Sequence, residues 1–134
     1  MKIYIAAKYA RRYELRSLVE KLKEIGHEVT SQWIYDSEPE KSIKEAAERD
    51  INDVLAAECL VFIGEPQASE NRGGGRWFEF GFAYAKEKRC IAVLSMDPSK
   101  GGHDHLPIGH ESVFTALLCV EIVHSQEELL SKLS

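Results

Sequence analysis

A single carboxylate, Glu79, stands within an aromatic segment that follows a run of glycines. The glycines are Gly73, Gly74 and Gly75, and the aromatic residues around the carboxylate are Trp77, Phe78, Phe80, Phe82 and Tyr84. A helix over residues 76–86 would be apolar on nearly every side, and a carboxylate in such a setting is uncommon without a reason. Glu79 is therefore a candidate nucleophile. The alternative is a residue that caps the helix or complements its dipole.

The glycines and a nearby set of basic residues suit an anionic or hydroxyl-rich ligand. Glycine lets the backbone approach a ligand closely, and the helix that follows presents unpaired N–H groups, with Arg76 as a charged side chain at that end. Lys8, Arg11 and Arg12 come directly after the first predicted strand. They form either the solvated start of a helix or a clamp for a phosphate group, and the sequence leaves both interpretations open.

Asp50 is a second candidate for chemistry. It lies with Asp53 on a predicted helix whose charges are spaced for i to i+4 pairs, so a solvated helix face is the alternative interpretation. Two carboxylates in different surroundings can divide the roles of nucleophile and acid between them. Asp50 has a catalytic role in this hypothesis only if the fold brings it close to Glu79.

The histidines of one glycine-rich loop raise the question of a metal. His103, His105 and His110 lie there together with Asp104. Their spacing fits no rigid pattern of metal ligands, because such sites place their ligands at fixed, short intervals. We expect no metal and no cofactor, and we interpret the loop as a cover for the site or as a contact with a neighbouring subunit.

Short apolar runs alternate with helical periodicity along the whole chain. Strands are predicted over residues 2–7, 27–33, 59–65, 89–95 and 116–123, and helices over 11–26, 37–57, 76–86 and 126–133, the last capped by Ser125. This alternation predicts an α/β fold with a parallel sheet covered on both faces. Ligands of such sheets bind outside the carboxyl ends of the strands, where the strand order reverses. The glycine run and Lys8 both follow predicted strands.

Composition narrows the class of protein. The 134 residues predict one domain over 1–134, and 17 basic against 22 acidic residues, a net charge of −5, argue against nucleic acid as a partner. No apolar run of about 18 residues predicts a membrane span or membrane partner, so we expect a cytoplasmic protein. Cys59, Cys90 and Cys119 show no C-x-x-C spacing and are interpreted as reduced core thiols.

Three stretches carry a resemblance to a known family. They are KIYIAA at residues 2–7, RDINDVLAAECLVFI at 49–63 and GGGRWFEFGFAYAKEKRCIAV at 73–93. Together they resemble the nucleoside 2-deoxyribosyltransferase family and its nucleotide N-hydrolase relatives, in order and over nearly the whole chain. The most specific match is the pattern of Gly74, Gly75, Glu79, Gly81 and Ala83.

The resemblance implies a fold and a reaction. The fold is a flavodoxin-like or Rossmann-like three-layer sandwich with a five-stranded parallel sheet, assembled as a homodimer or larger homo-oligomer. Glu79 matches a nucleophile that attacks C1′ of a nucleoside or nucleoside 5′-monophosphate, with transfer to a free base or to water. Tyr4 matches a tyrosine that orients this glutamate, and Asp50 matches a carboxylate that assists at the base or sugar.

Several positions bear on the choice of substrate. Gly73 stands where transferases of the family carry an acidic residue and monophosphate hydrolases carry a serine. Ala6 and Lys8 lie in the first loop, and the charge of Lys8 favours a substrate with a 5′-phosphate. Ser112 matches a residue that family members lend to the neighbouring subunit's site. A base-stacking slot that uses Trp33 or Trp77 would favour transfer over hydrolysis.

Two other functions are weighed against this one. A nucleotide-binding module without turnover would use the same glycines and N–H groups, with Glu79 in a structural role. The cytokinin-activating phosphoribohydrolases carry G-G-x-G-T-x-x-E, whereas this chain has G-G-G-R-W-F-E at residues 73–79, one residue shorter and without the threonine.

Overall fold

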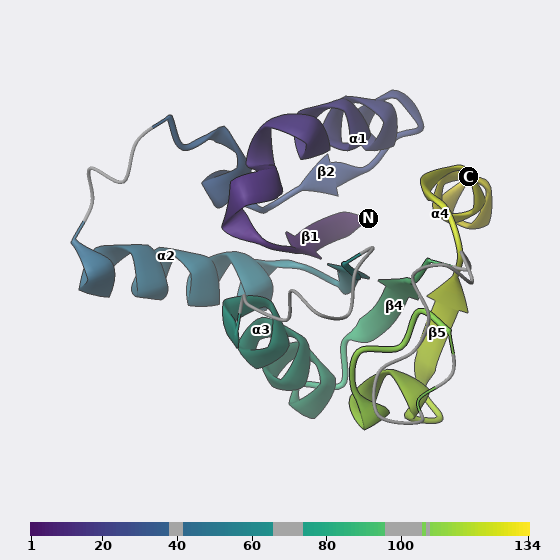
Figure 1. The fold of residues 1–134 in the computed structure, drawn as a ribbon. Coiled ribbons are helices and arrows are strands. Elements are labelled where there is room, and N and C mark those ends of the chain that lie inside the picture. Colours follow the sequence, from purple (N-terminus) through teal and green to yellow (C-terminus); the bar gives the residue numbers. More distant parts are fainter. Residues whose placement is uncertain (38–41, 66–73, 96–105, 107) are drawn as a thin grey trace.

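The computed structural model describes residues 1–37, 42–65, 74–95, 106 and 108–134 (Figure 1). The strands are β1 (Lys2–Ala6), β2 (Glu28–Val29), β3 (Cys59–Ile63), β4 (Arg89–Val93) and β5 (Val120–Val123). The α-helices are α1 (Arg12–Glu24), α2 (Ile43–Ala56), α3 (Gly74–Ala85) and α4 (Gln126–Leu133). Three short 3₁₀ helices are η1 (Tyr9–Arg11), η2 (Gln32–Tyr35) and η5 (Val113–Ala116).

The five strands form one all-parallel sheet in the order β2-β1-β3-β4-β5. Helices α1 and α4 contact each other on one face of the sheet, and α2 and α3 contact each other on the other (Figure 1). The predicted three-layer α/β fold with a five-stranded parallel sheet is confirmed. The strand order reverses between β1 and β3, so the carboxyl ends of these two strands mark the expected place for a ligand.

The helices form because their apolar residues recur at helical spacing and their ends are capped. Helix α1 buries Leu15, Leu18, Val19 and Leu22 against the sheet. At the start of α4 the Ser125 hydroxyl accepts from the Glu128 amide (3.0 Å), and the Glu128 carboxylate accepts from the His124 amide (2.7 Å). This reciprocal pair satisfies two backbone donors and confirms the predicted cap. None of the described helices is long and apolar enough to cross a membrane.

The second predicted strand is much shorter than the sequence indicated. Residues 27–33 were expected to be extended, but β2 pairs only Glu28 and Val29 with β1, and the chain then turns into η2. Two contacts with β1 account for the turn: the Ser31 hydroxyl accepts from the Ile5 amide (2.5 Å), and the Trp33 indole donates to the Ile5 carbonyl (3.0 Å). Side chains therefore occupy the backbone groups that a longer β2 would have paired.

Other boundaries also differ from the prediction. The helix expected over 76–86 begins two residues earlier, at Gly74, and β5 begins at Val120, because residues 113–116 form η5. Helix α2 begins after Ser42, whose hydroxyl accepts from the Glu45 amide, and the first part of its predicted span, 38–41, lies outside the described residues. Of the three predicted core thiols, Cys59 and Cys90 are buried but Cys119 is exposed.

Candidate active site

Tyr4 and Glu79 meet between the sheet and α3. Tyr4, in the middle of β1, is fully buried, and its hydroxyl donates a hydrogen bond to Oε2 of the half-buried Glu79. Burial and the adjacent Glu79 charge raise the pKa of Tyr4, so its hydroxyl stays protonated and remains a donor. The contact holds one carboxylate oxygen in place, and Oε1 remains as the second oxygen of the same group.

The surroundings of Glu79 oppose its ionisation. Burial raises the pKa of Glu79 to about 7, and the charges of Asp50 and Asp53 act in the same direction, while the hydrogen bond from Tyr4 lowers it. Desolvation therefore outweighs the hydrogen bond. A carboxylate with this pKa is divided between its two protonation states near neutral pH, as suits a group that reacts and is then regenerated.

The structure brings Asp50 to the same place from α2. Asp50 is half-buried, and burial raises its pKa while Arg49 lowers it. Its charge acts on both Tyr4 and Glu79. Three residues that lie far apart in the sequence therefore share one electrostatic environment, and the solvated-face interpretation of Asp50 is not what the structure shows.

Two glycines begin α3, and no other described residue crowds them. Gly74 and Gly75 are its first two residues and are exposed, and a Cβ atom added at either would meet no atom of another described residue within 4 Å. Unpaired amides at a helix N-terminus attract anions and hydroxyl groups. Gly73 lies outside the described residues.

Arg76 does not offer its charge to a ligand in this structure. Its side chain is buried, and Nη1 and Nη2 donate to the two oxygens of Glu111 at 3.0 and 2.8 Å. Glu111 Oε2 also accepts from the Glu65 amide (3.0 Å). Arg76 therefore ties α3 to the segment before η5 and to the end of β3, in place of the predicted contact with substrate. No local sequence pattern pointed to Glu111, because the two residues are 35 positions apart.

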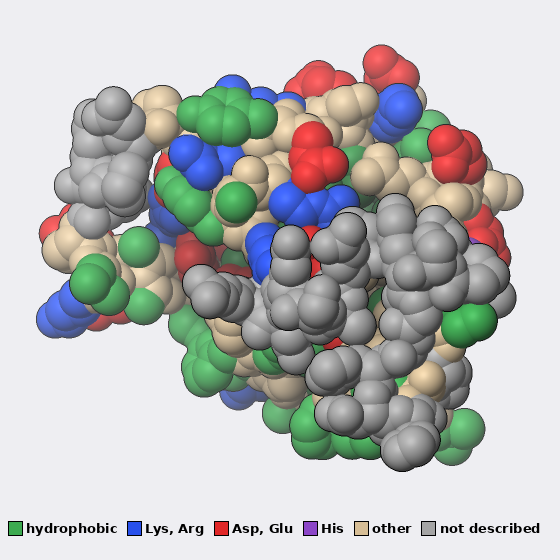
Figure 2. Space-filling view, viewed as in Figure 1, with side chains coloured by type: hydrophobic (Ala, Val, Ile, Leu, Met, Phe, Trp, Pro, Cys, Tyr) green, Lys and Arg blue, Asp and Glu red, His purple; other side chains and the backbone are tan. Residues whose placement is uncertain are grey.

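The charged side chains of the first loop differ in what they bind. Ala6 is buried at the end of β1, and the half-buried Lys8 follows it. Arg11 pairs with Glu14 (2.7 Å) and donates to the Gly64 carbonyl (3.1 Å). Arg12 donates to the Asp36 carbonyl (2.9 Å). Both arginines thus bind groups of the protein itself. Lys8 remains a candidate for a phosphate because it follows the carboxyl end of β1. Basic and acidic side chains lie next to one another near the middle of the face in Figure 2.

Trp33 is not positioned to stack on a base. It is only 4% exposed, and its indole N–H is bonded to the Ile5 carbonyl. The Tyr9 ring packs against it at a centroid distance of 6.1 Å and is 40% exposed. Tyr9 is therefore an exposed aromatic residue in the loop after β1, with the Arg12 guanidinium 4.2 Å from its ring centroid. Sequence reasoning missed it because Tyr9 reads equally well as the first turn of a helix.

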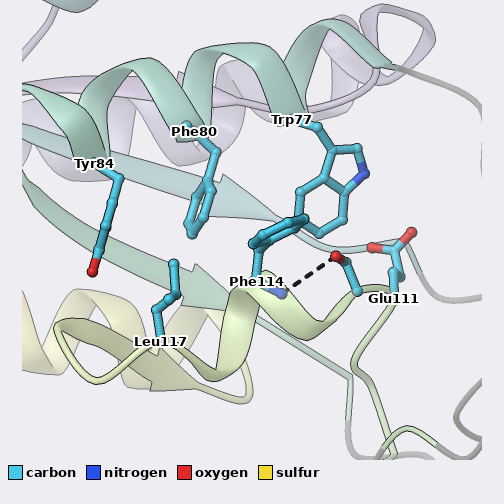
Figure 3. Close-up of a pocket in the computed structure, with 8 residues that line it drawn as sticks. Trp77, Phe80, Tyr84, Glu111, Phe114 and Leu117 are labelled. Atoms are coloured by element: carbon cyan, nitrogen blue, oxygen red, sulfur yellow. Dashed lines mark hydrogen bonds between the residues drawn. The ribbon is translucent and has the colours of Figure 1, made fainter.

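Ser112 lines a largely apolar cavity of about 620 Å³ on another side of α3 (Figure 3). Trp77, Phe80 and Tyr84 project from α3 toward Phe114 and Leu117, with Glu111 at one end. The Ser112 hydroxyl accepts from the Phe114 amide (3.3 Å). Glu79 is not among the lining residues, so within this chain Ser112 belongs to a different surface from the Tyr4–Glu79 pair.

The metal prediction concerns residues that are mostly outside the described part. His103, Asp104 and His105 lie there, and His110 bonds through Nδ1 to the Thr115 hydroxyl (2.6 Å). Burial lowers the pKa of His110, which favours its neutral form. Among the residues that the structure describes, no three histidine, cysteine or acidic side chains gather in a way that could hold a metal ion.

Comparison with known proteins identifies the fold. No protein-family model and no curated protein sequence matches the chain. A conserved protein from Enterococcus faecalis V583 superposes with a TM-score of 0.75 at 22% identity, covering 99% of this chain and 96% of that one. The Clostridium botulinum CMP N-glycosidase BcmB superposes with a TM-score of 0.67 at 18% identity, covering 99% of this chain and 98% of that one.

A 2-deoxyribosyltransferase from Bacillus psychrosaccharolyticus is also similar, with a TM-score of 0.69 at 15% identity over 99% of this chain and 96% of that chain. At these identities the likeness concerns the fold. The chain has the fold of the nucleoside 2-deoxyribosyltransferases and of an N-glycosidase, and the resemblance found in the sequence is confirmed at that level.

The raised pKa of Glu79 predicts a pH-dependent effect of Glu79→Gln on stability. Between the ordinary glutamate pKa of 4.5 and about 7, the folded protein keeps a proton that the unfolded chain releases. Stability therefore falls as pH rises through this window. We expect Glu79→Gln to raise Tm relative to the wild type at pH 8 and to change it little at pH 4. Thermal unfolding at both values, with exposed Glu48→Gln as the control, measures this. Equal shifts at both pH values would contradict the assigned pKa.

Proposed function

We propose that the protein cleaves the N-glycosidic bond of a nucleoside or nucleoside 5′-monophosphate, with Glu79 as the nucleophile. The observation that carries this proposal is the part-buried hydrogen bond between Tyr4 and Glu79, whose pKa is raised by burial and by the charge of Asp50. The similarity in fold to proteins described as a 2-deoxyribosyltransferase and a CMP N-glycosidase supports it. The open N-terminus of α3 supports a ligand with hydroxyl or phosphate groups.

The proposed reaction has two steps. Glu79 Oε1 attacks the anomeric carbon C1′, the C1′–N bond breaks, and its electron pair leaves with the base, which gains a proton from a nearby acid or water. In the second step the nitrogen of another base, or water, attacks C1′, loses a proton and releases the Glu79 carboxylate. Transfer and hydrolysis differ only in this second acceptor.

Tyr4 and Asp50 have distinct roles in this mechanism. The Tyr4 hydroxyl binds Oε2 of Glu79 and so fixes the orientation of the carboxylate, with Oε1 as the attacking oxygen. The same hydrogen bond stabilises the carboxylate each time the ester is broken. Asp50 supplies a second carboxyl group that can accept from a sugar hydroxyl or exchange a proton with the base. The two carboxyl groups differ in burial and partners, as a division of labour requires.

A non-catalytic nucleotide-binding module is the second candidate. It is favoured by the same open helix terminus, which by itself needs no nucleophile. The raised pKa of Glu79 argues for the enzyme, because a binding module gains nothing from a carboxylate that is costly to ionise. Incubation with a panel of nucleosides and their monophosphates, with and without an acceptor base, separates the two by whether base is released or exchanged.

Loss of the Glu79 carboxylate should abolish base release. We expect Glu79→Gln and Glu79→Ala to keep the fold and to lose at least 100-fold in kcat/KM, about 2.7 kcal/mol of barrier. In the wild type, kcat/KM should rise with pH through about 7, because the nucleophile must be ionised. Base release followed by chromatography, with Glu48→Gln as the control, tests both. Activity of Glu79→Ala within tenfold of wild type would rule out the nucleophilic role.

Lys8 should separate monophosphate from nucleoside substrates. A charge-assisted hydrogen bond to phosphate contributes about 1.5 to 3 kcal/mol, so Lys8→Ala should raise KM for a nucleoside monophosphate tenfold or more. The KM of the matching nucleoside should barely change. Lys44→Ala, on the exposed side of α2, is the control. Equal effects of Lys8→Ala on both substrates would mean that the lysine only shapes the loop.

The apolar surface of α3 and its neighbours predicts a homodimer or larger homo-oligomer. Phe78 is 64% exposed and stacks on Phe82, and Leu118 beyond η5 is 99% exposed. Such a surface is rarely left in water, and a partner copy could bring its Ser112 to the site. We expect light scattering at micromolar concentration to give at least twice the mass of the chain, and Phe78→Asp to lower it. A monomeric wild type would contradict this.

A further inference from the structure

Arg49 lies between two carboxylates and binds both. Its guanidinium forms a bidentate pair with Asp36, with Nη1–Oδ1 at 2.8 Å and Nη2–Oδ2 at 3.0 Å. The same group donates to Oδ1 of Asp50 from Nε (3.2 Å) and Nη2 (3.1 Å). The Arg49 side chain is 10% exposed and the Asp36 and Asp50 side chains are 25% and 29% exposed, so these pairs are part-buried and less screened than fully exposed ion pairs.

The two partners of Arg49 belong to different parts of the fold. Asp50 is its neighbour on α2, whereas Asp36 ends η2, the turn that replaces the predicted end of β2. The same turn is bound to α2 a second time through Gln32. Its backbone N–H and its side-chain Nε2 donate to the Asp53 carboxylate at 3.1 and 2.8 Å. Arg49 and Asp53 therefore fasten the segment 32–36 to α2 at its two ends.

Arg49 binds Asp50 through one of its two carboxylate oxygens. Both of its hydrogen bonds to Asp50 end on Oδ1, and no described residue donates to Oδ2. A carboxylate held by one oxygen has a fixed orientation and can still accept a hydrogen bond on the other. This is the arrangement expected of a carboxylate that receives a hydroxyl or N–H group of a substrate.

Arg49 offsets the repulsion that the neighbouring negative charges exert on Asp50. The charges of Asp36 and Asp53 act on Asp50, and the charges of Asp50 and Asp53 act on Glu79, which accepts the hydrogen bond of Tyr4. Burial raises the pKa of Asp50, and the charges of Asp53 and Asp36 add to that effect, whereas Arg49 lowers it through charge and hydrogen bonding. The cation thus favours the charged form of Asp50 against its surroundings.

We propose that Arg49 is a positioning residue for the glycosidic reaction: it fixes Asp50 as an oriented carboxylate, with Oδ2 presented to the substrate, and couples that orientation to the segment 32–36. This inference rests on the proposed function for its kinetic consequence. The arrangement of Asp36, Arg49 and Asp50 can also be tested without substrate.

The test compares variants that change the charge around Asp50 in opposite senses. Arg49→Met removes the cation at similar volume, Arg49→Lys keeps charge without the bidentate fork, and Asp36→Asn removes one competing carboxylate. Lys44→Met is the control, because Lys44 lies on the exposed face of the same helix. Titration of the Asp50 side-chain carboxyl by ¹³C NMR, assigned through Asp50→Asn, should give a higher pKa in Arg49→Met and a lower one in Asp36→Asn.

The kinetic arm uses the same variants. We expect Arg49→Met to lose at least tenfold in kcat/KM at pH 7, about 1.4 kcal/mol, and Arg49→Lys to recover part of it, while Lys44→Met stays at the wild-type value. A merely structural arginine would lower Tm and leave the Asp50 titration and the pH profile unchanged, which would overturn the proposal.

Failure of the proposed function is distinguishable from failure of this inference. A wild type that releases no base from any substrate would reject the function, while the opposite NMR shifts in Arg49→Met and Asp36→Asn would still support the charge coupling of Asp36, Arg49 and Asp50. An unchanged Asp50 pKa in folded Arg49→Met would reject the inference even if the wild type is active. If Arg49→Met does not fold, the expected fall of the Asp50 pKa in Asp36→Asn decides the matter.

Discussion

The hydrogen bond between the Tyr4 hydroxyl and the Glu79 carboxylate is the contact on which the rest of the site depends. It joins the middle of a buried strand to a helix on the sheet, and it needs a carboxylate where burial opposes one. One donor cannot offset that desolvation, so the pKa of Glu79 stays raised. A helix carrying this many aromatic residues could pack more stably with an apolar residue at this position. The retained carboxylate is therefore best explained by chemistry.

Ion pairs hold α3 and α2 against neighbouring segments of the chain. On one side Arg76 and Glu111 form a buried bidentate pair that ties α3 to the segment before η5. On the other, Arg49 connects Asp50 on α2 to Asp36 at the end of η2. The Arg76 pair is buried and the Arg49 pairs are part-buried. A shielded pair adds little net stability, but breaking it leaves an uncompensated charge. Such contacts fix geometry, which a site with two carboxyl groups requires.

Periodicity and capping predicted much of this architecture, and long-range pairing determined the rest. The strands predicted over 59–65 and 89–95 are present as β3 and β4, each two residues shorter, and Ser125 caps α4 as expected. Trp33 lies in a 3₁₀ helix and not in the predicted strand, because its indole donates to the Ile5 carbonyl. No local sequence pattern predicts this contact. Arg76 was predicted to bind an anionic ligand because its actual partner, Glu111, is remote in the sequence. Glu79 stood out because a carboxylate conflicts with its apolar surroundings, and that conflict is local.

Mass spectrometry of a trapped intermediate tests the central claim most directly. A nucleoside with fluorine at C2′ slows formation and breakdown of a glycosyl ester by destabilising the positive charge that develops on the sugar, and an excess of it allows the ester to accumulate. After acid quenching and proteolysis, the account predicts one added fluorodeoxyribosyl group on the peptide that contains Glu79, with fragmentation placing it on that residue and none in Glu79→Ala. Release of the base with every Glu79 peptide unmodified, or with the sugar on another residue, would contradict the account.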